Sequence, residues 1–294
     1  MSKYVTMSNL GSNGRYGNIF FQLNVLFYIS DKYDYKIVFN KKQNKLLNEF
    51  CLIKFEDIDN YNIVFTNYYE QEEYGDTYLN YYIKNNKNKN LNLSGFFQNF
   101  SYLRNRFFKS FFNFDKFKIL DNYFLEYKKY NKVGIHIRLG DYIDEFKNVY
   151  NCIINWKIDC NLVINNIISL FDKIYPNNKF FVFSDSIDKC KEILNNKELI
   201  FMDNKHNSLQ DMYLLSKCDH FILTNSTFGY WSYLFSLINI DNINNIHCFF
   251  PDKYFLDNTY HERYNKKLIS SWFNKKMKLY LYSTDTINII KYNK

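Results

Sequence analysis

The second half of the chain alternates apolar runs of strand type with segments whose apolar residues recur at helical spacing. Strands are predicted at residues 133–139, 179–184, 199–201 and 221–224. The helices predicted between and after them lie at residues 159–171, 187–194, 209–218 and 228–237. Strands that alternate with helices in this way form right-handed βαβ units around a parallel sheet. The pattern therefore predicts an α/β fold with a parallel sheet in this half.

Polar side chains end three of these predicted strands. His136, Arg138 and Asp141 end the first, Asp185 ends the second and Asn225 follows the fourth. Because the carboxyl ends of parallel strands share one edge of a sheet, we expect these residues to meet in one crevice. The planar guanidinium of an arginine binds phosphate through several N–H donors and stays charged. We therefore predict that Arg138 binds a nucleotide diphosphate.

The residues at this edge also allow other interpretations. His136 alternates with Arg138, so the two could instead form an ion pair at the end of the strand. Asp185 suits a ribose or base hydroxyl, but it equally suits the N-terminal cap of the next helix. Ser226 and Thr227 precede a predicted helix, and their hydroxyls together with its free N–H groups suit a phosphate.

The first half begins with a predicted strand, a glycine-rich loop and a helix. Residues 4–10 are strand-like, and residues 11–18 hold three of the eight glycines of the chain. Such a loop lets the backbone approach a ligand closely, although it matches neither the dinucleotide-binding nor the phosphate-binding glycine motif. Further helices are expected at residues 19–32, 46–53 and 101–112, and further strands at residues 35–39, 62–66 and 91–97.

A helical segment over residues 115–131 connects the two predicted halves. We place one domain over residues 1–125 and a second over residues 126–294. In the second domain, Ser208 with Asp211 predicts a capping box. Near the C-terminus, residues 268–272 and 276–282 suit either a helix or a strand.

The composition indicates a folded protein that attracts anions. Hydrophobic residues make up 47% of the 294 residues, which excludes a disordered chain despite the many Asn and Lys. The formal net charge of +8 is spread along the chain, so it favours anionic ligands in general. An RNA-binding role would predict steep salt dependence of affinity, but no zinc, RRM or KH signature occurs. We therefore expect no nucleic-acid partner.

Cysteine, histidine and targeting patterns exclude several other classes. The six cysteines form no C-x-x-C pair and the histidines show no ligand spacing, so we expect reduced thiols and no metal. The N-terminus has no signal-peptide pattern, and no run of about 18 apolar residues occurs. We expect a cytoplasmic protein without an integral membrane segment, and peripheral membrane association stays open.

Four short motifs occur in the order in which one enzyme family carries them. They are Gly14-Arg15-Tyr16-Gly17-Asn18 with Phe20-Phe21-Gln22, His136-Ile137-Arg138-Leu139-Gly140-Asp141-Tyr142, Phe181-Val182-Phe183-Ser184-Asp185, and Asp211-Met212-Tyr213-Leu214 with Asn225-Ser226-Thr227-Phe228 and Trp231. They resemble G-R-x-G-N-x-x-F-Q, H-x-R-R-G-D-Y, F-x-F-S-D-D and D-L-x-L-M-S-x-C with N-S-S-F-S-W-W of the α-1,2-fucosyltransferases (glycosyltransferase family 11).

The resemblance implies a GT-B-like pair of Rossmann-type domains facing a cleft, with an acceptor-side first domain and a nucleotide-sugar-binding second domain. It also implies GDP-fucose as donor, a glycan acceptor such as the galactose 2-OH, inversion at the anomeric carbon, and no metal or other cofactor. By motif position, Arg138 would neutralise the diphosphate while His136 and Asp141 shape the same catalytic site. The donor-binding residues would be Arg15, Gly17 and Asn18 from the first domain and Asp185, Asn225, Ser226 and Thr227 from the second.

Three positions depart from the family pattern. Leu139 stands in place of the second arginine, Ser186 in place of the second aspartate of F-S-D-D, and Tyr230 in place of the first Trp. Leu139 alternates with Arg138, so it should face away from the site. The departures keep two alternatives open: a GDP-sugar-binding protein with weakened catalysis, and a transferase that uses another nucleotide sugar.

Overall fold

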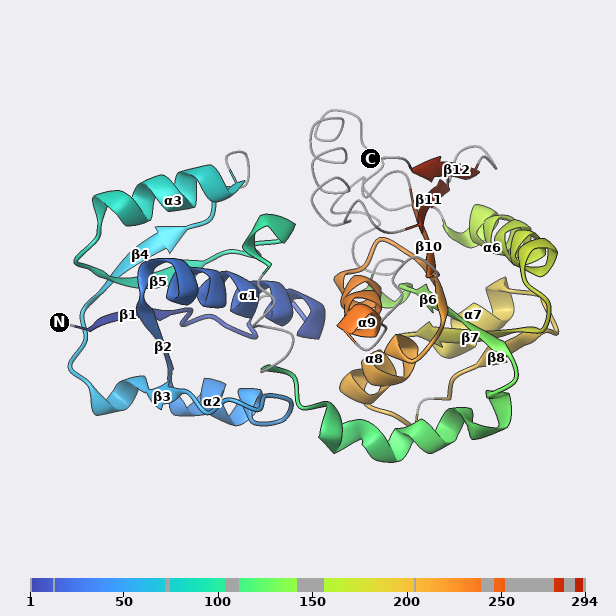
Figure 1. The fold of residues 1–294 in the computed structure, drawn as a ribbon, viewed down its shortest axis with the longest axis horizontal. Coiled ribbons are helices and arrows are strands. Elements are labelled where there is room, and N and C mark those ends of the chain that lie inside the picture. The colour runs from blue at the N-terminus through green and yellow to red at the C-terminus, as the bar shows by residue number, and fades with distance from the viewer. Residues whose placement is uncertain are drawn as a thin grey trace. The chain divides into compact units, whose positions relative to one another are not determined.

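The computed structural model consists of two compact α/β units, Met1–Lys118 and Ile119–Lys294 (Figure 1). The structure describes residues 2–12, 14–71, 75–103, 111–141, 156–203, 205–238, 246–251, 278–282 and 289–292. The division falls inside the predicted connecting segment, where the chain forms the 3-10 helix η3 (Phe114–Tyr127). Most of the predicted helix over residues 101–112 and the whole of segment 268–272 lie outside the described residues.

The first unit is built on a parallel sheet of strand order β3-β2-β1-β5-β4. Its strands are β1 (Lys3–Thr6), β2 (Tyr35–Phe39), β3 (Glu56–Asp57), β4 (Phe65–Tyr69) and β5 (Asn90–Ser94). Its helices are α1 (Tyr16–Tyr33), α2 (Lys41–Leu47) and α3 (Gly75–Asn85), with the 3-10 turns η1 (Ile58–Asn60) and η2 (Phe100–Tyr102).

Helix α1 forms the centre of the core of this unit. It is apolar on nearly every side, and Phe20, Leu23 and Leu26 are fully buried. Helix α2 replaces the helix predicted at residues 46–53. It begins earlier because Asn40 and Gln43 form a capping box, in which each side chain accepts a hydrogen bond from the backbone N–H of the other residue.

The second unit is built on a larger sheet of strand order β12-β11-β10-β9-β6-β7-β8. Its strands are β6 (Asn131–Ile137), β7 (Asn178–Ser184), β8 (Leu199–Phe201), β9 (His220–Leu223), β10 (His247–Pro251), β11 (Lys278–Tyr282) and β12 (Ile289–Tyr292). Its helices are α6 (Trp156–Ile174), α7 (Ile187–Ile193), α8 (Ser208–Ser216) and α9 (Thr227–Ile238). All eight strands and helices predicted over residues 133–237 are present, with ends shifted by a few residues, whereas β10 and β12 were not predicted.

Strand β6 lies in the middle of this sheet and pairs in parallel with β7 and β9. The chain continues from β6 to β7 and β8 on one side, and from β9 to β10 on the other. The strand order therefore reverses between β6 and β9. Open α/β sheets bind ligands beyond the carboxyl ends of the strands at such a switch point.

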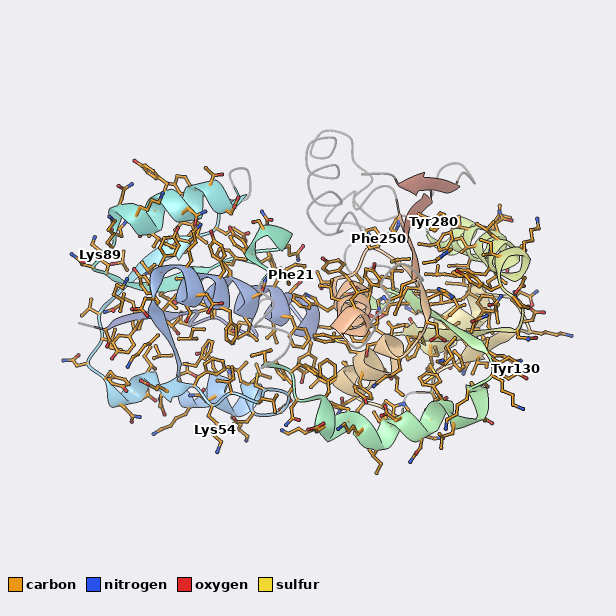
Figure 2. All side chains as sticks on the ribbon, viewed as in Figure 1. Phe21, Lys54, Lys89, Tyr130, Phe250 and Tyr280 are labelled. Atoms are coloured by element: carbon orange, nitrogen blue, oxygen red, sulfur yellow. The ribbon has the colours of Figure 1, made fainter. Side chains whose placement is uncertain are left out.

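Alternate residues of β6 face two different layers. Val133 and Ile135 belong to a buried apolar cluster that includes residues of α6 and β7. Gly134 faces α8 instead, since a Cβ atom there would come within 2.4 Å of the side chain of Leu215. Side chains fill the interior of both units, as Phe21 and Phe250 illustrate (Figure 2). Among the helices of the described segments, none is both long and apolar enough to cross a membrane.

Candidate active site

The carboxyl end of β6 carries a guanidinium held between two carboxylates. Arg138 Nη2 lies 2.5 Å from Asp141 Oδ1, and Arg138 Nη1 lies 2.6 Å from Asp185 Oδ2. The arginine and Asp185 side chains are only 13% and 14% exposed, and Asp141 is 26% exposed. The structure therefore brings the predicted residues Arg138, Asp141 and Asp185 together at the edge of the central strand.

The backbone at this edge is fixed from both neighbouring strands. On the β9 side, Arg138 N donates to Thr224 Oγ1 at 3.1 Å. On the β7 side, Leu139 N and Gly140 N donate to Asp185 Oδ1 at 3.0 and 3.3 Å. These three backbone contacts with side chains from distant parts of the sequence hold the turn after β6 in one position.

His136 is buried and is not paired with the arginine. Its ring stacks on Phe228 with centroids 4.9 Å apart. Burial lowers the pKa of His136 to about 3; the charge of Asp185 opposes this shift, and the charge of Arg138 adds a smaller lowering. An imidazole and a guanidinium are both cations when charged, so they cannot form an ion pair, and the alternative of a His136–Arg138 pair is wrong. Arg138 is paired with acids instead.

Two glycines leave the space that the side chains of Asp185 and His136 occupy. A Cβ atom on Gly140 would lie 2.3 Å from Asp185 Oδ2, and one on Gly229 would lie 3.0 Å from His136 Nδ1. Neither glycine has a positive φ angle, so the need is for space rather than for a special backbone conformation. The sequence shows Gly140 as part of a Gly-Asp turn, and nothing local indicates that a carboxylate from another strand would fill the place of its side chain.

The predicted phosphate-binding loop lies at the end of β9 and leads into α9. Asn225 and Ser226 are buried, and Thr227 is the first residue of the helix. Ser226 Oγ accepts a hydrogen bond from Phe228 N at 3.3 Å. The helix start predicted here is confirmed. It supplies N–H groups and a partial positive charge at the switch point.

The glycine-rich motif of the first unit lies at the start of α1, beyond the end of β1. Gly14 has a φ angle of +91°, which a residue with a side chain rarely adopts. Arg15 is exposed at the N-terminal cap of the helix, and Gly17 is buried in its first turn. Asn18 accepts a hydrogen bond from Gln98 at 3.0 Å. The roles predicted for Arg15, Gly17 and Asn18 in donor binding stay predictions.

Leu139 faces the core, as predicted. It is 1% exposed and belongs to the apolar cluster that includes residues of β6, α6 and β7. The position of the missing family arginine is therefore on the opposite side of the strand from Arg138.

Asp211 is a half-buried acid whose environment the sequence did not reveal. The predicted Ser208–Asp211 capping box is wrong, because Asn207 and Gln210 form the box of α8. Burial, followed by the charge of Asp203, raises the pKa of Asp211 to about 7. Its Oδ1 atom is buried without a hydrogen-bond partner, and His206 Nδ1 lies 3.8 Å away. Asp211 thus places a carboxyl group in the first turn of the helix that follows β8.

The described segments hold no cluster of metal-ligating side chains, and the free cysteines described there are buried. No group of three or more His, Cys, Asp or Glu residues there could hold a metal ion. Burial raises the thiol pKa of Cys51, Cys190, Cys218 and Cys248, which disfavours the reactive thiolate. The side chains of Cys152 and Cys160 lie outside the described residues.

A parallel sheet with an arginine and a helix start at its switch point is typical of proteins that bind a nucleoside diphosphate. The sequence model of Glycosyl transferase family 11 matches residues 1–269. The chain belongs to this family, and the recognition from the four motifs is confirmed.

Curated relatives match part of the chain. Galactoside alpha-(1,2)-fucosyltransferase 2 of Rattus norvegicus is 29% identical over 104 residues, which cover 34% of this chain and 28% of the relative. Alpha-1,2-colitosyltransferase of Escherichia coli is 33% identical over 106 residues, which cover 34% of this chain and 35% of the relative. The chain thus matches about a third of the length of each.

Solved structures show the same fold over most of the chain. NodZ alpha-1,6-fucosyltransferase co-crystallized with GDP superposes with a TM-score of 0.52 at 12% identity, covering 80% of this chain and 93% of the other. NodZ soaked with GDP-fucose gives a TM-score of 0.51 at 14% identity, covering 80% of this chain and 93% of that one. The predicted α/β fold of GT-B type, with a parallel sheet in the C-terminal half, is confirmed.

Proposed function

We propose that this chain transfers L-fucose from GDP-fucose to a hydroxyl of a glycan, the 2-OH of galactose, with inversion and without a metal ion. The family membership and the curated relatives support the reaction class. The observation that carries the proposal is Arg138, fixed at the carboxyl end of the central strand where the strand order reverses. No other described cation is held at that edge by contacts from both neighbouring strands.

The proposed reaction needs a base for the acceptor hydroxyl and positive charge at the leaving diphosphate. The acceptor oxygen attacks the anomeric carbon from the face opposite the diphosphate, the bond from that carbon to the diphosphate oxygen breaks, and GDP leaves with the electron pair. The hydroxyl proton passes to a general base. Positive charge must meet the leaving diphosphate, and Arg138 with the N-terminus of α9 would supply it.

Other groups at the sheet edge suit the nucleotide. Asn225, Ser226 and Thr227 place an amide and two hydroxyls at the start of α9. In the first unit, Arg15, Gly17 and Asn18 are proposed donor-binding residues on the strength of their motif positions.

The test is transfer of labelled fucose from GDP-fucose to galactose-terminated glycans. Arg138→Ala should lower kcat by about 10²- to 10³-fold, the usual effect of removing one group that stabilises developing negative charge. Lys191→Ala is the matched control, because this lysine is a 53% exposed cation on α7. Retention of activity in a chelator and an inverted product by NMR are expected. Failure of the wild-type chain to bind GDP and to transfer fucose would refute the proposal.

A second candidate is transfer of a different sugar from a GDP-linked donor. The colitosyltransferase relative, which is the more identical of the two over a similar length, motivates it. Comparing kcat/KM for GDP-fucose and GDP-colitose on one acceptor would decide between the two donors. A GDP-binding protein without turnover on a broad acceptor array would instead indicate weakened catalysis.

A further inference from the structure

We infer that Asp185 is a positioning residue for Arg138 rather than a ligand of the nucleotide. The inference rests on the proposed function, because it assigns how the diphosphate-binding arginine of that site is held. The sequence leaves Asp185 as a partner of a ribose or base, or as a helix cap. The contacts of both its carboxylate oxygens point to a different role.

Both oxygens of Asp185 are directed at the end of β6. Oδ1 accepts from the backbone N–H groups of Leu139 and Gly140, and Oδ2 lies 2.6 Å from Arg138 Nη1. One carboxylate therefore fixes the turn that follows β6 and the direction of the guanidinium at the same time. Charge-assisted hydrogen bonds of this kind are short and directional. At 14% exposure, little of the side chain remains for a ligand.

Gly140 is the structural complement of this carboxylate. An added Cβ atom would lie 2.3 Å from Asp185 Oδ2, so any other residue would push the carboxylate away from the arginine. The two residues after Leu139 therefore both contribute to the position of Arg138. Its glycine admits Asp185, and its aspartate, Asp141, provides the second carboxylate on Arg138.

The two carboxylates have different tasks. Two carboxylates and one guanidinium carry a net negative charge. This charge repels an incoming diphosphate unless the diphosphate takes the place of one carboxylate on Arg138. Asp141 is 26% exposed and its described contact is with the guanidinium. Asp185 is less exposed and binds three donors. The diphosphate thus replaces Asp141, while Asp185 continues to orient Arg138.

The experiment compares Asp185→Asn, Gly140→Ala and the double variant with the wild-type chain, using kcat and the affinities for GDP and 2′,3′-dideoxy-GDP. Asp188→Asn is the matched control, because this aspartate on α7 is 81% exposed and pairs with Lys191. Thermal unfolding of each variant verifies that it is folded. The two nucleotides differ only in the ribose hydroxyls, so they separate a ribose contact from a phosphate effect.

Asp185→Asn should lower kcat by about 10- to 100-fold, the scale expected from a misplaced catalytic group. Its affinity for GDP should stay within about 3-fold, since the lost orientation is offset by one fewer negative charge near the phosphates. Gly140→Ala should lower kcat to a similar extent, and the kcat losses of the double variant should not multiply, because both changes act on one contact. The affinity ratio of the two nucleotides should equal that of the wild type.

A change in that ratio on substitution would show a ribose contact and overturn the inference, as would multiplicative losses in the double variant. Asp141→Asn should raise GDP affinity, and an unchanged affinity would refute the division of tasks. If the wild-type chain binds no GDP, the proposed function fails. If it binds GDP and Asp185→Asn keeps full kcat, only the role of Asp185 fails.

Discussion

Replacing Leu139 with arginine, the residue of the family motif, should destabilise the protein and leave the donor site no stronger. Leu139 is 1% exposed within an apolar cluster that includes Ile164 of α6 and Phe180 of β7. Removing a buried leucine side chain costs about 2–5 kcal/mol. A guanidinium in its place would also be buried among the apolar side chains of this cluster, which adds further cost. We expect a loss of at least about 3 kcal/mol in the free energy of unfolding.

Urea denaturation followed by circular dichroism measures this loss. With a denaturant slope of about 3 kcal/mol/M, the midpoint should fall by about 1 M. Leu162→Arg on α6 is the matched control, because Leu162 is 48% exposed and should tolerate the change within about 0.5 kcal/mol. A Leu139→Arg protein with an unchanged midpoint and tighter GDP binding would show that position 139 faces the donor site, which would refute the reasoning.

Three further changes test other parts of the structure. Asp211→Asn should stabilise the protein at pH 8 and not at pH 4. Folding raises the pKa of the Asp211 carboxyl from 3.8 to about 7. The wild-type protein therefore loses stability as pH rises from about 4 to 7, by up to about 4 kcal/mol, and Asp211→Asn avoids this loss. Equal increases of the urea midpoint at pH 4 and pH 8 would contradict this. Gly229→Ala should destabilise by about 1–3 kcal/mol, because its Cβ would press on the His136 ring. Helix propensity alone predicts that the variant is more stable by about 0.5–1 kcal/mol. Thermal unfolding shows which of the two effects is larger. Glu70 Oε2 accepts two backbone N–H bonds at 2.7 Å from the loop after β5. Glu70→Ala should therefore speed hydrogen exchange at the amide of Phe96 by at least about 10-fold, and unchanged exchange would exclude this role.

The regular part of the second unit was predictable because its signals are local. A strand such as β7 or β8 is a short apolar run, and α6 is a segment with helical spacing of apolar residues. Parallel pairing then follows from the alternation, and it brings the strand ends to one edge. His136, Arg138, Asp185 and the loop at Asn225 were found in this way.

The elements that were missed have signals that are weak or not local. The start of α2 depends on Asn40, one of many asparagines in this chain, so its capping role does not stand out. Strands β10 and β12 were not predicted, although β10 is buried throughout. Strand β12 pairs antiparallel with β11. Strands of this kind are defined by the neighbour that they pair with, and sequence patterns alone do not show that neighbour.

The sequence by itself determined the fold class, the family and the strand end that carries Arg138, because apolar periodicity and short motifs are readable residue by residue. Only the tertiary structure decided what Arg138 touches. Asp185 and Thr224 reach the end of β6 from strands 46 and 86 positions away along the chain. The structure also showed that the space beside Gly140 belongs to a carboxylate and that His136 is held neutral. These facts depend on distances between side chains of different strands and on their removal from water, which exist only once the sheet has formed.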